Sequence, residues 1–182
     1  MRADSSRAAP DLMAIVRRAY QAALELGTTR GAERSRAVRA LAQALKHSAD
    51  DILEANTLDL EASREMAVPE LILDWLKLTP ERLHTTIQML ERLSELSDPI
   101  RRVMNASYQL EHSQTYCQLM PLGTIALIYE AFPELGAIAA GLCIKTGNSL
   151  ILRGGSEASH SNAAIAEALK FALDDCGMPP GC

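Results

Sequence analysis

The chain has 182 residues, 48% hydrophobic and 23% charged, the balance of one soluble globular domain or slightly more. A net charge of −5 and only seven aromatic residues argue against nucleic-acid binding, which needs a positive surface and stacking rings. The longest uncharged apolar run, residues 135–144, is too short to span a membrane, and the N-terminus lacks a secretory signal. We therefore expect a cytoplasmic protein without a metal site, whose four scattered cysteines are reduced thiols.

The first 120 residues hold 32 of the charged residues and two of the ten glycines, a composition typical of surface helices. Apolar side chains recur at helical spacing over residues 12–26, and Gly27 stops this first helix. A second amphipathic stripe covers residues 38–45. Ser48 is a plausible N-cap for a third helix that continues through Met66.

Pro69 suits the first turn of a short fourth helix. The Thr-Pro-Glu sequence at residues 79–81 predicts the N-cap and first turn of a fifth helix, which the Asp-Pro pair at residues 98–99 ends. The pattern then changes to alternation, which predicts a hairpin. Its first strand contains Tyr108 and Leu110 up to His112, and its second strand covers residues 116–120.

The last part of the chain reads as strand, helix, strand, helix. A continuous apolar run over residues 124–129 predicts a strand covered on both faces. Residues 133–145 form the next helix and residues 149–152 a second buried strand, after which Ser156 can cap a helix to about residue 176. This spacing suits one βαβ crossover, the unit of a doubly wound nucleotide-binding sheet.

The predicted fold is therefore α/β: N-terminal helices, then a β-hairpin, then the first part of a parallel sheet. The expected divisions are a helical segment over residues 1–105, the hairpin over 106–122 and a partial α/β domain over 123–182. The hairpin could serve oligomerisation, making a homo-oligomer, or could pack on its own domain. The residues leave both roles open.

Ligands of open α/β sheets bind beyond the carboxyl ends of the strands. Two segments are expected there, residues 130–133 and 153–157. In the second, Arg153 supplies a positive charge, Gly154 and Gly155 let a ligand approach the backbone, and Ser156 begins a helix whose free N–H groups favour an anion. This pattern supports two interpretations about equally. One is a site for a phosphate or ribose, and the other is a plain glycine turn with a solvated arginine.

Other chemistry has weaker support. The dinucleotide-binding G-x-G-x-x-G, the P-loop, H-E-x-x-H and G-x-S-x-G motifs do not occur. Cys143 lies in an apolar helix and is better explained as a core residue than as a nucleophile. Glu130 could act as an acid or base, or could pair with Lys145 or Arg153. The remaining candidates are the histidines, best explained as surface residues: His47, His84, His112 and His160.

The sequence resembles the gamma-glutamyl phosphate reductases (glutamate-5-semialdehyde dehydrogenases) of the aldehyde dehydrogenase superfamily. The segment PLGTIALIYEAFPELGAIAAGLCIKTGNSLILRGGSEA, residues 121–158, is similar to the start of their cofactor domain, with KTGN and LRGG at the right distance from YEA. ILEANTLDLEASRE (52–65), LTPERL (78–83) and the Asp-Pro pair (98–99) are similar to their N-terminal helices, and GMPPG (177–181) to the turn before the next strand.

The resemblance implies an aldehyde-dehydrogenase-type Rossmann-like sheet and the reduction of L-glutamyl 5-phosphate to glutamate 5-semialdehyde with NADPH, a step of proline biosynthesis. The small-molecule substrate is then glutamyl phosphate. Arg153, Gly154, Gly155, Ser156 and Glu157 match the segment that contacts the adenosine half of the cofactor. Glu130 and Ala131 match the strand end facing its pyrophosphate and nicotinamide half.

Two departures from the family pattern stand out. Where the family reads YEARPNVT, this chain reads YEAFPELG, so that Phe132 replaces an arginine and Glu134 an asparagine. The family's catalytic cysteine matches none of the four cysteines here, so no catalytic residue is expected in this chain, which looks like an N-terminal fragment, inactive alone. Two alternatives stay open: a non-catalytic nucleotide-binding or assembly module, and a superfamily oxidoreductase acting on another aldehyde or acyl phosphate.

Overall fold

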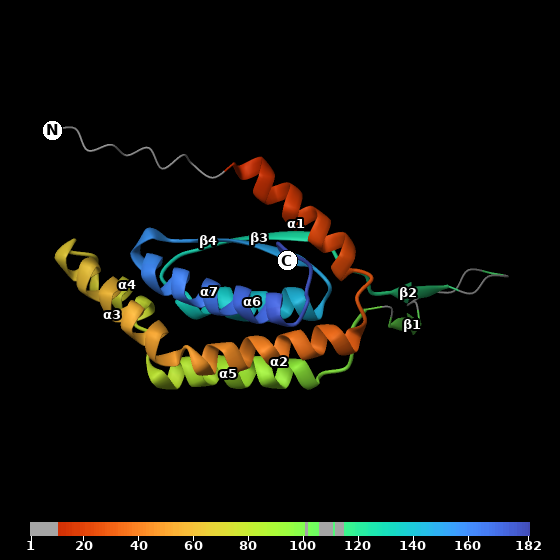
Figure 1. Cartoon of the computed structure of the whole chain (residues 1–182), viewed down its shortest axis with the longest axis horizontal. Coiled ribbons are helices and arrows are strands. Elements are labelled where there is room, and N and C mark those ends of the chain that lie inside the picture. Colours follow the sequence, from red (N-terminus) through yellow and green to blue (C-terminus); the bar gives the residue numbers. More distant parts are fainter. Residues whose placement is uncertain (1–10, 101, 106–110, 112–114) are drawn as a thin grey trace.

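The computed structural model describes residues 11–100, 102–105, 111 and 115–182, and these form the α/β fold that the sequence predicts (Figure 1). The helices of the first part are α1 (Leu12–Leu26), α2 (Gly31–His47), α3 (Ala49–Glu65), α4 (Glu70–Leu76) and α5 (Pro80–Glu95). After them come β1 (Val103–Asn105), β2 (Tyr116–Gln118), β3 (Thr124–Tyr129), α6 (Pro133–Lys145), β4 (Ser149–Gly154) and α7 (Ser159–Asp175). None of these helices is long and apolar enough to cross a membrane.

The elements stack in layers on either side of β3 and β4. Helix α1 packs on one face of this small sheet, α6 packs on the other, and α7 lies beside α6 (Figure 1). Helices α2 and α5 form the next layer, while α3 and α4 extend past the end of the sheet opposite to the β1–β2 hairpin (Figure 1). The carboxyl ends of β3 and β4 therefore lie near α3 and α4.

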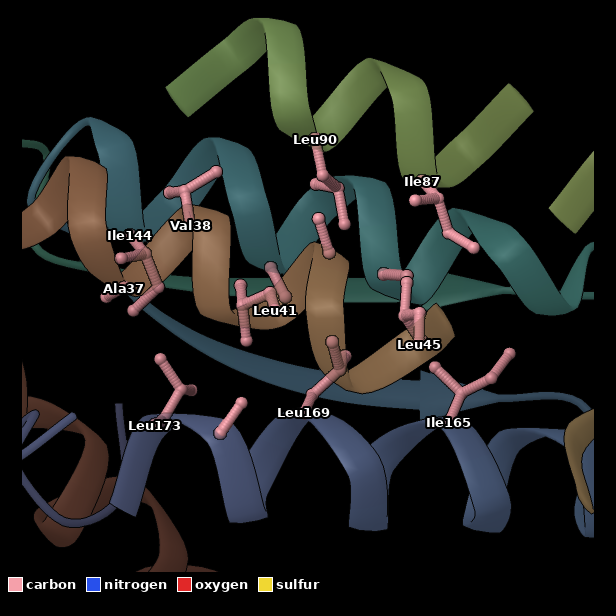
Figure 2. Close-up of a cluster of buried hydrophobic side chains, with 14 of the residues drawn as sticks. Ala37, Val38, Leu41, Leu45, Ile87, Leu90, Ile144, Ile165, Leu169 and Leu173 are labelled. Carbon is pink, nitrogen blue, oxygen red and sulfur yellow. The ribbon is translucent and has the colours of Figure 1, made fainter. Parts of the chain in front are cut away.

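One apolar cluster joins the helices into a continuous core. Figure 2 shows α2 in the middle of it, with Val38, Leu41 and Leu45 between side chains of α5, α6 and α7. Leu90 of α5 and Leu169 of α7 are both nearly inaccessible to solvent. Burying each such side chain contributes about 1.5–3 kcal/mol, so this cluster is the main source of stability. It spans both the helical first part and the last part of the chain.

The sheet has the predicted βαβ connection. Strands β3 and β4 are parallel neighbours, in register from Thr124 opposite Ser149 to Tyr129 opposite Gly154, and α6 makes the crossover. The strand at residues 124–129 was expected to be covered on both faces. The structure shows that this is wrong for β3, because Ile128 is 79% exposed. Leu150 packs against the core, whereas α1 leaves part of the opposite face open to solvent.

Several element boundaries confirm the sequence analysis. The structure begins and ends α1, β3 and α6 at the predicted residues, and Thr79 caps α5 by accepting a hydrogen bond from the Arg82 amide. Two predicted positions are wrong. Pro69 is the N-cap of α4 rather than part of its first turn, and Ser156 opens a short 3-10 turn, so that α7 starts only at Ser159.

A hairpin is present, and the described part of its first strand lies before the predicted one. Val103 to Asn105 of β1 pair antiparallel with Gln118 to Tyr116 of β2. The second strand thus lies where the alternation predicted it. Tyr108, Leu110 and His112, which the sequence analysis assigned to the first strand, fall outside the described residues.

Candidate functional site

The carboxyl ends of β3 and β4 meet, as the parallel register requires, and a hydrogen bond joins the segments that follow them. The Ala131 amide donates to Oε1 of Glu157 over 2.7 Å. Ala131 is 2% exposed and has a positive φ of 52°, a conformation that costs a non-glycine residue free energy and needs support from its surroundings. Two of the seven predicted site residues are therefore in direct contact across the strand ends.

The two glycines of this site lie against side chains of the same chain. A Cβ atom on Gly154 would clash with Nδ2 of the Asn162 side chain, and one on Gly155 would clash with Glu157 Oε1. The space above both glycines is thus occupied by side chains of this chain. Gly154 and Gly155 thus make room for Asn162 and Glu157, and the approach of a ligand to their backbone stays a prediction.

Of the predicted site residues with polar side chains, Arg153, Ser156 and Glu130 are exposed and Glu157 is partly exposed. The Arg153 guanidinium donates to the carbonyl of its neighbour Gly154 over 2.9 Å. Neither Arg153 nor Lys145 forms an ion pair with Glu130 in the described part of the chain. Lys145 is buried instead, and its Nζ donates to the Leu96 carbonyl over 2.6 Å. Glu130 and Arg153 can therefore still contact a ligand.

The start of α7 is not the open anion site that the sequence suggested. The amides of His160 and Ser161 donate to the two carboxylate oxygens of Asp59, over 3.0 and 2.7 Å. Asp59 belongs to α3 and is 2% exposed. A carboxylate from a distant helix thus occupies the place at which a ligand phosphate would bind a free helix N-terminus.

The two residues that depart from the family pattern join α4 and α5 to the start of α6. The Phe132 ring stacks on Trp75, with centroids 5.5 Å apart. Glu134 forms an ion pair with Arg82, whose guanidinium also donates to the Trp75 carbonyl over 3.2 Å. Sequence analysis missed the roles of Asp59, Trp75 and Arg82, because each depends on a partner distant along the chain.

Two of the four thiols, Cys143 and Cys182, lack the properties of a catalytic cysteine. Burial raises the pKa of Cys143 to about 11, and it also raises the pKa of Cys182 to about 11. A thiol with such a pKa is protonated at neutral pH and is a poor nucleophile. This agrees with the prediction that Cys143 is a core residue.

Comparisons with known proteins agree with the resemblance. The family model described as "Aldehyde dehydrogenase family" matches residues 3–182. Gamma-glutamyl phosphate reductase 2 of Synechocystis is 55% identical over 96% of this chain, which covers 42% of that relative. Gamma-glutamyl phosphate reductase of Gloeobacter violaceus is 40% identical over 94% of this chain, which covers 41% of that relative. The chain thus spans about two fifths of the curated relatives it matches.

A solved structure supports the same assignment. The gamma-glutamyl phosphate reductase of Thermotoga maritima superposes with a TM-score of 0.84 at 32% identity, over 93% of this chain and 41% of that one. The family-model match over almost the whole sequence, the relatives and the shared fold lead to one conclusion: the chain belongs to the aldehyde dehydrogenase family.

Proposed function

We propose that the chain is part of an NADPH-dependent oxidoreductase of proline biosynthesis, a cytoplasmic enzyme that reduces L-glutamyl 5-phosphate to L-glutamate 5-semialdehyde. The names of the relatives support the reaction. The observation that carries the chain's own part in it is the hydrogen bond between Glu157 and the Ala131 amide. This bond brings the two strand-end segments together at the edge where open α/β sheets bind nucleotides.

The accessible groups at this edge suit the adenosine half of the cofactor. A carboxylate accepts several hydrogen bonds, so Glu157 can receive a ribose hydroxyl while one oxygen still holds Ala131. The exposed guanidinium of Arg153 can pair with a phosphate through parallel N–H groups. When bound, NADPH would supply the hydride. The role of these residues is to orient the nucleotide at the strand ends.

The proposal assigns no nucleophile to this chain. Reduction of an acyl phosphate through a thioester needs a thiolate near neutral pH. Cys143 and Cys182, with a pKa of about 11 each, do not provide one. Since the family's catalytic cysteine also matches none of the four cysteines of this chain, we expect these 182 residues to catalyse no turnover.

The test is a titration of the purified chain with NADPH, followed by the fluorescence of the nicotinamide. Arg153→Ala should weaken binding about tenfold, the loss expected for one charge-assisted hydrogen bond. Lys170→Ala, which removes an exposed cation from α7, is the matched control and should leave the affinity unchanged. Unaltered NADPH fluorescence with the original chain would refute the nucleotide site. Phosphate-dependent oxidation of added glutamate 5-semialdehyde, with reduction of NADP to NADPH, would refute the predicted inactivity.

A further inference from the structure

The Asp59 carboxylate on α3 accepts hydrogen bonds from the first residues of α7. Its Oδ1 accepts from the His160 amide over 3.0 Å and lies 2.7 Å from His160 Nδ1. Its Oδ2 accepts from the Ser161 amide over 2.7 Å and from the Ser161 hydroxyl over 2.6 Å. The N-cap of α7 is Ala158, which has no polar side chain of its own. The cap of this helix therefore comes from a residue about a hundred positions earlier.

Asn56, one turn before Asp59, continues the same buried network. Its Nδ2 donates to the Ser161 hydroxyl over 3.0 Å and to the Leu76 carbonyl over 2.9 Å, and its Oδ1 accepts from the Leu78 amide over 2.8 Å. Asn56 and Asp59 are each 2% exposed. Buried polar side chains are costly unless their hydrogen bonds are made, and here they are made to the segments that flank the strand ends.

We propose that Asp59 is a positioning residue for the candidate nucleotide site. The inference rests on the proposed function of that site. Glu157 lies two residues before α7, in a segment that follows Gly154, the last residue of β4. The register of β4 fixes one end of this segment and Asp59 fixes the other. Asp59 thus determines where the Glu157 carboxylate lies relative to Ala131.

The same contact determines which part of a nucleotide this edge can hold. Asp59 places a negative charge at the N-terminus of α7 and uses the amides of His160 and Ser161. A phosphate entering there would meet that charge and find those donors occupied. The strand-end edge therefore holds the nucleoside part through Glu157. Exposed cations such as Arg153 make the contacts with phosphate.

The test compares Asp59→Asn with Asn148→Ala. Asn148 is also buried, and its Oδ1 accepts from the Gly123 amide over 2.8 Å at the opposite, amino-terminal edge of the sheet. Asp59→Asn should raise the Kd for NADPH about tenfold and speed hydrogen exchange of the amides in residues 154–161. Asn148→Ala should lower stability while changing the Kd less than twofold. Both are compared under conditions where the proteins are folded.

Ser161→Ala is the second variant, in case Asp59→Asn does not fold. It removes the hydroxyl's bond to Asp59 and the bond that the hydroxyl accepts from Asn56, and it keeps both amide bonds to Asp59. A weakening of NADPH binding by about threefold is expected. NADPH affinity equal to that of the original chain in the folded variants would overturn the inference. Exchange that rises throughout the protein, rather than in residues 154–161, would also overturn it. Failure of the original chain to bind NADPH would instead refute the proposed function, and the exchange measurement would still test the anchoring of this segment.

Discussion

Burial controls the chemistry of Cys143. The side chain lies on the core face of α6 and is 8% exposed, and loss of solvation raises its pKa from 9.0 to about 11. In the unfolded chain the thiol loses its proton near pH 9. Between pH 9 and 11 the unfolded state therefore binds fewer protons than the folded state, and stability falls as the pH rises. One such group costs up to about 1.4 kcal/mol for each pH unit in this window.

We predict that Cys143→Ala makes stability less dependent on pH between 9 and 11. Urea unfolding at several pH values from 8 to 11 measures the slope. Lys145, whose pKa burial lowers, changes stability in the opposite direction, but it is present in both proteins and cancels in the comparison. Cys117→Ala is the control, because Cys117 is exposed on β2, and it should leave the slope unchanged. Parallel pH profiles for the original chain and Cys143→Ala would contradict the prediction.

Two buried cations hold the carboxyl ends of neighbouring helices together. Lys145 Nζ, at the end of α6, donates to the carbonyls of Ser94 and Leu96 at the end of α5. Arg34 of α2 donates to the Lys145 carbonyl over 3.3 Å and pairs with Asp98 over 2.6 Å. Carbonyls at helix ends lack partners within the helix, and positive charge there is also favoured by the helix dipole.

Lys145→Met should therefore destabilise the protein by about 3 kcal/mol, since it leaves the carbonyls of Ser94 and Leu96 buried without their donor. Urea unfolding near neutral pH measures the loss. Lys170→Met, on the exposed side of α7, should change the unfolding free energy by less than about 0.5 kcal/mol. A loss below 1 kcal/mol for Lys145→Met would show that water replaces the ammonium group.

Sequence analysis succeeded where an element's ends are set by its own residues. Thr79 caps α5 with its own hydroxyl, and the apolar run of β3 and the proline at the start of α6 are local signals. It failed where the determinant is distant along the chain. The start of α7 was misplaced because its cap is Asp59, and the packing of the Glu157 side chain against Gly155 was not predicted. The site could thus be placed at the strand ends, but its internal contacts could not.

At the scale of the whole molecule, the parallel sheet has more apolar surface than its helices cover. Parallel sheets are normally buried on both faces. Here α1 contacts β4 and β3, yet Ile128 remains 79% exposed, and Leu122, just before β3, is 86% exposed. In the described residues, β3 pairs with β4 alone, so its other edge has no strand partner. An open apolar face beside an unpaired edge favours association between molecules.

We predict that the chain self-associates as its concentration rises and that Ile128→Lys reduces this association. The charge adds repulsion at the open face, and because the side chain is already exposed, the unfolding free energy should change by less than about 0.5 kcal/mol. Sedimentation velocity over a series of concentrations measures the effect. Leu71→Lys on α4, where the side chain is 58% exposed and belongs to a helix outside the sheet, is the control and should associate like the original chain. Equal association of Ile128→Lys and the original chain would show that molecules meet through another surface.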